Sequence, residues 1–119
     1  MKKRLRCYLR SYRRRWGFTQ QELAFILGIK GNGHISRLER GEASPTLAIV
    51  LALYVMFGTA PEELFPALFA EIEDHAVARA YDLYERLQGG SSKATRMKLD
   101  FLEAVFERAK QRSKNNAHA

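Results

Sequence analysis

The sequence has few of the residues that would favour a disulfide framework, a β-rich fold or a membrane span. Cys7 is its only cysteine, so no disulfide can form within the chain, which fits a reducing cytoplasm. Three prolines and the absence of a long alternating β-branched run favour an all-α fold. The strongly apolar run over residues 47–57 is too short to cross a bilayer, so it predicts a buried helix and no membrane partner.

The chain also lacks the motifs that usually carry catalysis. It has no glycine-rich phosphate loop, no zinc-binding spacing of Cys and His, and no recognisable pair of catalytic carboxylates. His34 stands far in sequence from His75 and His118, without a cluster of acids or cysteine, which argues against a metal role for it. We therefore expect a protein that is not an enzyme and that has no catalytic residue, metal site or cofactor.

Positive charge is present in excess, and it is concentrated near the start of the sequence. The formal net charge is +7, and residues 1–40 hold eleven Lys and Arg against two acids. Residues 41–119 hold nine Lys and Arg against eleven acids. A concentrated basic field attracts polyanions such as nucleic acid. A solubilising basic tail would give the same composition, so charge alone leaves both interpretations open.

Three short helices are expected in the first forty residues. The first covers about Arg4 to Trp16, and Gly17 ends it. Its expected apolar face is made of Leu5, Tyr8, Leu9, Tyr12 and Trp16. The second begins at Thr19, which forms a capping box with Glu22. Its buried face is supplied by Leu23, Ala24, Ile26 and Leu27, and Gly28 ends it.

A glycine-rich turn, residues 29–33, separates the second helix from the third. The third runs from His34 to Arg40 and turns Ile35 and Leu38 inward. Two short helices joined by such a turn are a known DNA-reading unit, in which the second helix enters the major groove. The fourth helix, about Thr46 to Phe57, is apolar on nearly all sides, so part of its surface is a candidate interface. Pro61 opens a short fifth helix.

Five sequence pieces, in order, closely resemble the Cro/phage-repressor family of helix-turn-helix domains, often called XRE-like. These are Gly17-Phe18-Thr19-Gln20-Gln21-Glu22-Leu23-Ala24, Leu27-Gly28-Ile29, Ile35-Ser36-Arg37-Leu38-Glu39-Arg40-Gly41, Pro45-Thr46-Leu47 and Phe57-Gly58-Thr59-x-x-Glu62-Glu63-Leu64-Phe65. The resemblance spans about residues 5–65. It implies an all-α, five-helix DNA-binding domain over residues 1–66 and double-stranded DNA as the partner.

The resemblance also implies roles for individual residues. Those expected to read bases are Asn32, Gly33, His34, Ser36 and Arg37. Those expected to contact phosphates are Thr19, Gln20, Lys30, Arg40, Ser44 and Thr46. Arg13 and Glu39 match a structural pair that joins the first helix to the third in many members of the family.

Two features leave the base-reading assignment open. The segment Lys30-Gly31-Asn32-Gly33-His34 is a residue longer than the usual family turn, so the start of the recognition helix is not defined by the resemblance. Asn32 and Gly33 are also ordinary turn residues, and Arg37 is alternatively a solvated surface arginine.

Residues 67–112 are expected to form a C-terminal two-helix hairpin, about Pro66 to Leu87 and Lys93 to Arg112, around the turn Gln88-Gly89-Gly90-Ser91-Ser92. Residues 113–119 are expected to be a disordered tail. The first hairpin helix is acidic and the second basic, which favours antiparallel pairing within or between chains. A homodimer interface is predicted at Tyr81, Tyr84, Phe101, Leu102, Val105 and Phe106. The alternative is a hairpin that packs only on its own DNA-binding domain.

The sequence therefore predicts a cytoplasmic transcriptional regulator, associated with the nucleoid when it binds DNA. The leading interpretation is a repressor that binds a palindromic operator as a homodimer. A second is an antitoxin-type DNA-binding protein whose C-terminal hairpin binds a partner protein. A third, a small nuclease, would require metal-dependent cleavage of the bound DNA.

Overall fold

A computed structural model describes residues 5–117 of the chain, with side chains to residue 115. The described residues form α-helices and contain no strand, which confirms the all-α prediction. The chain divides into two units between Ala70 and Glu71. No helix of the described part is long and apolar enough to span a membrane.

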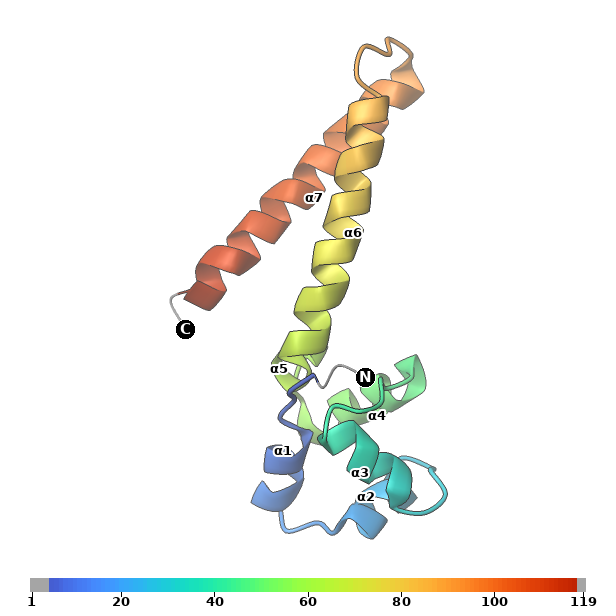
Figure 1. Cartoon of the computed structure of the whole chain (residues 1–119), viewed down its shortest axis with the longest axis vertical. Coiled ribbons are helices and arrows are strands. Elements are labelled where there is room, and N and C mark those ends of the chain that lie inside the picture. Colours follow the sequence, from blue (N-terminus) through green and yellow to red (C-terminus); the bar gives the residue numbers. More distant parts are fainter. Residues whose placement is uncertain (1–4, 118–119) are drawn as a thin grey trace. The chain divides into compact units, whose positions relative to one another are not determined.

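The first unit contains five helices around one core (Figure 1). They are α1 (Leu9–Arg15), α2 (Gln20–Ile26), α3 (Gly33–Glu39), α4 (Leu47–Phe57) and α5 (Pro61–Leu64). Helix α6 (Pro66–Arg86) crosses the division between the units and forms a hairpin with α7 (Lys93–Ala117).

Helix α1 begins at Leu9, so the prediction of a helix from Arg4 was wrong over residues 5–8, while Arg4 itself lies outside the described residues. Partners distant in sequence hold the backbone of this segment. The Leu5 N–H donates to the Gly41 carbonyl oxygen at 3.1 Å, and the Tyr8 N–H donates to that of Leu64 at 2.8 Å. These bonds replace the helical ones that the apolar spacing predicted.

The expected apolar face of α1 is only partly buried. Leu9 is fully buried and Tyr12 packs against the core, but the Trp16 side chain is 66% exposed and Tyr8 is also exposed. Trp16 follows the last helical residue, where the helix no longer directs its side chain toward the core. Tyr8 and Trp16, which were expected on the apolar face, therefore do not pack into the core.

Helix α2 begins with the predicted capping box. The Thr19 hydroxyl accepts from the Glu22 N–H at 3.0 Å, and the Glu22 carboxylate accepts from the Thr19 N–H at 2.9 Å. Leu23 and Ala24 are buried, whereas Ile26, in the last helical position, is exposed. The prediction was thus confirmed for the start of α2 and wrong for the burial of Ile26.

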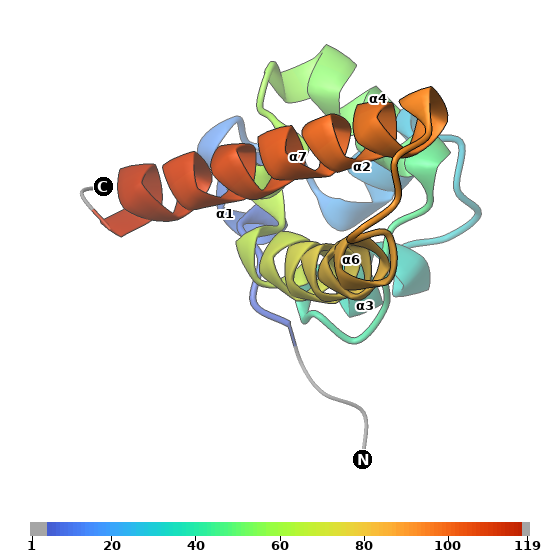
Figure 2. The same cartoon turned by 90° about the horizontal axis from the view of Figure 1, so that it is seen from above.

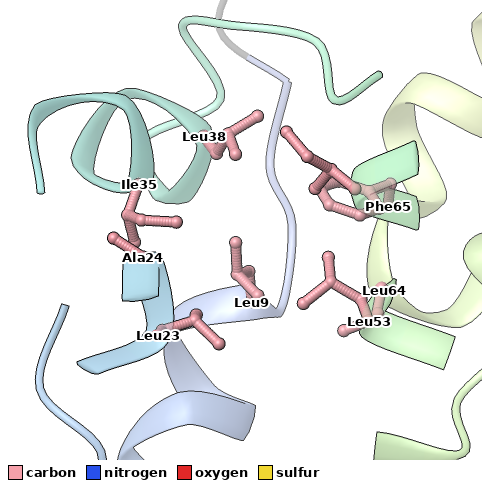
Figure 3. Packing of buried hydrophobic residues seen from close by; sticks show 9 residues of the cluster. Leu9, Leu23, Ala24, Ile35, Leu38, Leu53, Leu64 and Phe65 are labelled. Atoms are coloured by element: carbon pink, nitrogen blue, oxygen red, sulfur yellow. The ribbon is translucent and has the colours of Figure 1, made fainter. Parts of the chain in front are cut away.

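The core of the first unit is made mainly of leucine and isoleucine side chains that converge from all five helices, together with Ala24 and Phe65 (Figure 3). Its six fully buried large side chains are Leu9, Leu23, Ile35, Leu38, Leu53 and Leu64. Each such burial stabilises the fold by about 1.5–3 kcal/mol relative to exposure. Ile35 and Leu38 hold the inner side of α3, as predicted, so the other side of this helix faces outward.

Helix α4 has no charged residue, and the first unit covers only part of it. Ile49 and Leu53 are buried, whereas Leu47, Leu51 and Val55 are exposed along one side. The exposed residues recur at four-residue steps, which places them on one face of the helix. The prediction of a buried helix was therefore wrong for this face. That the exposed face of α4 is an interface stays a prediction.

The second unit contains the helical hairpin of α6 and α7, which agrees with the expected architecture. The two helices diverge away from their connecting turn (Figure 1), and α7 leans across α6 when the view is along α6 (Figure 2). Helix α7 continues through Ala117, beyond the predicted end at Arg112, so residues 113–117 are helical where a disordered tail was expected. The remaining tail residues, 118 and 119, lie outside the described residues.

Candidate nucleic-acid interface

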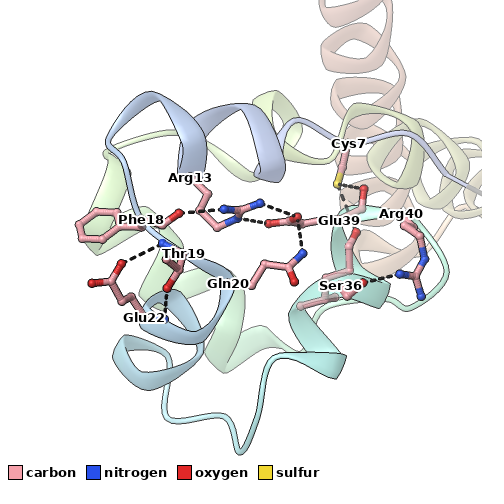
Figure 4. Close-up of polar contacts among 10 residues, drawn as sticks. Cys7, Arg13, Phe18, Thr19, Gln20, Glu22, Ser36, Glu39 and Arg40 are labelled. Carbon is pink, nitrogen blue, oxygen red and sulfur yellow. Dashed lines mark hydrogen bonds and ion pairs between the residues drawn. The ribbon is translucent and has the colours of Figure 1, made fainter.

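Three helices of the first unit are joined by a polar cluster of Arg13, Gln20 and Glu39 (Figure 4). The Arg13 Nε donates to Glu39 Oε2 at 2.5 Å, and its Nη2 donates to Oε1 at 3.2 Å. Both side chains are nearly buried, with exposed fractions of 9% and 3%. A bidentate arginine–carboxylate pair sets a defined orientation between the groups it joins. The cluster therefore orients α3 relative to α1 and α2.

Gln20, an expected phosphate contact, has its amide engaged within this cluster. Its Nε2 donates to Glu39 Oε1 at 3.0 Å. The same Arg13 also donates from Nη1 to the Phe18 carbonyl oxygen at 2.8 Å, which holds the chain between α1 and α2. Gln20 thus has a structural partner that the sequence did not indicate, and its contact with phosphate stays a prediction.

The base-reading candidates lie around the start and the outer side of α3. Asn32 precedes the helix, and its side chain makes no capping hydrogen bond. Gly33 is the first helical residue, so the recognition helix begins one residue before the predicted His34. Arg37 is exposed, and its Nη2 lies 3.5 Å from the His34 Nδ1. Asn32 and His34 therefore lie at the start of α3, and the Arg37 side chain lies beside His34.

Two other candidates, Ser36 and Arg40, contact each other. The Arg40 Nη1 donates to the Ser36 hydroxyl, and its Nε donates to Glu42 Oε2 at 3.1 Å. The Arg40 side chain is half exposed, so this is a solvated contact at the end of α3. DNA would have to compete with Ser36 and Glu42 for the Arg40 guanidinium.

The remaining phosphate candidates are exposed residues in turns and caps. Lys30 lies in the turn before α3, and Ser44 lies in the loop before α4. The Thr46 hydroxyl accepts from the Ile49 N–H at 3.3 Å and caps α4, as the Thr19 hydroxyl caps α2. Both threonines therefore have local structural roles besides the predicted one.

Burial governs the chemistry of Cys7, which lies beside the end of α3. Its thiol donates to the Leu38 carbonyl oxygen at 3.3 Å (Figure 4). Burial raises the pKa of Cys7, a backbone hydrogen bond at Leu9 lowers it by less, and the charge of Glu39 raises it further. A raised pKa keeps the thiol protonated and unreactive.

The six predicted dimer residues divide between the interior and the surface of the hairpin. Leu102 is buried, and the ring of Tyr84 contacts that of Phe106 with centroids 5.6 Å apart. The Tyr84 hydroxyl donates to Glu103 Oε1 at 2.8 Å, and this bond raises the pKa of Tyr84. Tyr81 and Phe101 are more than half exposed, and Val105 is partly buried. Leu102, Tyr84 and Phe106 therefore help to hold the hairpin itself together.

A family model of a helix-turn-helix domain matches residues 4–68, more than half of the 119 residues. The chain belongs to the helix-turn-helix domain family. The match includes α1 to α5 and therefore the polar cluster and the outer side of α3. This helix-turn-helix domain indicates a DNA-binding regulator. No curated protein and no solved structure matches the chain.

Among the described residues, no group of three or more His, Cys, Asp and Glu is placed to hold a metal ion.

Sequence reasoning missed the contact of Leu5 with Gly41, the hydrogen bond of Cys7 to Leu38 and the contact of Gln20 with Glu39. Each joins residues at least nineteen positions apart. Local periodicity carries no signal for such contacts.

Proposed function

We propose that the chain is a sequence-specific transcriptional regulator of the Cro/phage-repressor type that reads the DNA major groove with α3. One observation carries this proposal: α3 buries Ile35 and Leu38 while Arg37 remains exposed on its outer side. The polar cluster fixes the orientation of the helix. An exposed arginine on a rigidly held helix is suited to bidentate pairing with guanine O6 and N7.

The other residues near α3 divide into two roles. Asn32, Gly33, His34 and Ser36 flank Arg37 and read or approach base edges, and an Asn side chain matches the edge of adenine. Lys30, Arg40 and Ser44 contact phosphates, together with Thr19, Gln20 and Thr46. Phosphate contacts position the protein on the duplex without reading sequence.

Regulation by such a protein needs no catalytic residue or cofactor, because occupancy of a promoter is sufficient to repress it. One recognition helix reads few base pairs, so we propose a homodimer that binds a palindromic operator. Dimerisation is assigned to the hairpin of α6 and α7, which exposes large apolar side chains including Tyr81 and Phe101. The site of action would be the nucleoid in the cytoplasm.

Selection of bound sequences from random duplex DNA tests this proposal. The expected result is one enriched motif with two inverted half-sites, separated by about one helical turn or a multiple of it. The same selection with Arg37→Ala is the control, and it should lose preference at one position of each half-site. Recovery of random sequence by the wild-type chain would contradict sequence reading by α3.

The exposed apolar side chains of the hairpin also favour a second candidate. Ile72, Met97 and Phe101 are each more than half exposed, and a partner protein would cover such residues. The chain would then act as an antitoxin-type protein that binds both DNA and this partner. The molar mass of the isolated full chain in solution distinguishes the candidates, because a stable dimer supports self-association and a monomer supports a missing partner.

A further inference from the structure

The hairpin contains an apolar groove between α6 and α7, at the end away from their connecting turn. Tyr81 and Phe106 face each other across it, with ring centroids 5.7 Å apart. The other apolar side chains that line the groove are Val77, Ala78 and Ala109. These residues belong to the second unit alone. An apolar helical surface is normally buried against another element, and two helices alone leave this groove uncovered.

Charged residues border this groove with opposite signs on its two helices. Asp74 and Asp82 line it from α6, and Lys110 lines it from α7. No described residue forms an ion pair with any of these three side chains. The same asymmetry extends along the helices, since α6 has five acids and two basic residues and α7 has three acids and seven basic residues. The groove therefore matches a partner that is also acidic on one helix and basic on the other.

Two cross-helix contacts define the register of the hairpin. Arg112 pairs with Glu73 near the open end, and Tyr84 donates to Glu103 nearer the turn. Because the two helices run in opposite directions between these contacts, Lys110 lies level with the part of α6 between Asp74 and Asp82. This register determines which charges meet when a second hairpin packs on the groove.

A second copy of the chain can be placed face to face on the groove in two symmetric ways. With the two-fold axis across the helices, α6 lies on α6 of the other copy, and acidic residues oppose acidic residues. With the two-fold axis parallel to the helices, α6 lies against the basic α7 of the other copy. Rotation about this axis keeps each residue at its own level, so Lys110 of one copy comes between Asp74 and Asp82 of the other.

We propose that the groove binds the hairpin of a second copy in the arrangement with the axis parallel to the helices. The product is an antiparallel four-helix bundle in which Val77, Tyr81, Phe106 and Ala109 are buried. Lys110 of each copy pairs with Asp74 and Asp82 of the other. This inference rests on the homodimer of the proposed function and specifies its interface. In the alternative arrangement, acidic residues would face acidic residues, and this repulsion disfavours that arrangement.

The second copy is favoured over an unrelated partner by the groove's own chemistry. An isologous interface must be complementary to itself, and this groove carries both signs of charge on helices that exchange places under the two-fold rotation. Neighbouring helices in the bundle run antiparallel, as they do in up-down bundles.

The test uses full-length chains and the dimer dissociation constant from sedimentation equilibrium. Lys110→Glu alone opposes acids at the interface, and Asp74→Lys with Asp82→Lys alone opposes basic residues. Each should raise the homodimer dissociation constant about tenfold or more. Arg79→Glu makes the same charge change as Lys110→Glu on an exposed residue outside the groove. It should leave the dissociation constant within about threefold of wild type.

Mixing the two variant chains separates contacts between copies from contacts within one copy. In the mixed dimer, Glu at 110 of one chain faces the lysines of the other, and Lys110 of the second chain faces the native aspartates. The mixture should therefore recover a heterodimer with close to wild-type affinity. If Lys110 instead paired with Asp74 and Asp82 of its own chain, mixing the two variants would not restore dimerisation. Circular dichroism of each variant verifies that it remains helical.

Three outcomes would overturn the inference: a monomeric wild-type chain at micromolar concentration, a Lys110→Glu homodimer as tight as wild type, or a mixture that stays monomeric. A Lys110→Glu homodimer as tight as wild type would mean that the chain dimerises through another interface. DNA selection on the same chains reports separately on the proposed function. Rescue by mixing without any DNA preference would support the groove dimer and contradict the regulator.

Discussion

Arg13 and Glu39 form a nearly buried bidentate ion pair that joins α1 to the end of the recognition helix. Removing one partner would leave the other charged, unpaired by the removed group and largely shielded from water. Arg13→Ala should therefore lower the free energy of unfolding by about 3–5 kcal/mol, the cost of breaking a buried pair from one side. Urea denaturation followed by circular dichroism measures this change.

Arg14→Ala is the matched control, because Arg14 lies next along α1 and is exposed. It should change the free energy of unfolding by no more than about 0.5 kcal/mol. Equal effects of the two substitutions would show that the pair does not stabilise the domain.

Gly41 follows the recognition helix at a φ of 74° and touches the backbone of Leu5. A Cβ at this position would collide with the Leu5 carbonyl group. The two backbones are held together by the Leu5 N–H, which donates to the Gly41 carbonyl oxygen. Gly31 has a similar φ of 72° but has open space around it. Gly31→Ala should cost about 1–2 kcal/mol for the left-handed backbone alone. Gly41→Ala should cost clearly more, and equal midpoints of thermal unfolding for the two variants would argue against the close approach.

Cys7 should react slowly with alkylating reagents in the folded chain and quickly once urea unfolds it. Its raised pKa means that the fold favours the neutral thiol. The resulting stabilisation is present at neutral pH and is lost as the pH rises through the thiol pKa of the folded chain. The stability of the wild-type chain should thus fall in the alkaline range relative to Cys7→Ser. Parallel stability curves for both proteins would contradict the assigned shift.

Local spacing predicted contacts between residues close in sequence but not contacts between distant residues. The capping box of Thr19 and Glu22 and the inward side chains of Ile35 and Leu38 follow from local spacing. The start of α1 does not, because Leu5 and Tyr8 give their backbone hydrogen bonds to Gly41 and Leu64. Tertiary bonds overrode a continuous apolar periodicity there.

In the candidate site, one contact between distant residues was predictable, because the family resemblance implied it and local spacing did not. The resemblance indicated that Arg13 and Glu39 are paired, and the structure brings them together at 2.5 Å. The engagement of Gln20 with Glu39 could not be inferred, because it depends on how α2 and α3 pack. Phe101 and Phe106 were assigned to one interface, but five residues along a helix separate two side chains by about 140°. Only Phe106 lines the groove.

Lys30 is exposed in the turn before α3, and the proposed function assigns it a phosphate contact. Lys30→Ala should weaken binding to all duplexes by a similar factor and reduce the salt dependence of the association constant by about one in slope. Fluorescence anisotropy at several salt concentrations measures this slope. An unchanged slope would show that Lys30 does not contact a phosphate.

Sequence reading by α3 through Arg37 is best tested by the ratio of dissociation constants for a selected site and a scrambled duplex. Both constants are measured at one salt concentration, for the wild-type chain and for Arg37→Ala. The wild-type chain should prefer the selected site, and the variant should lose about 1–3 kcal/mol at one base position. Equal affinity of the wild-type chain for both duplexes, or equal losses on both in the variant, would contradict it.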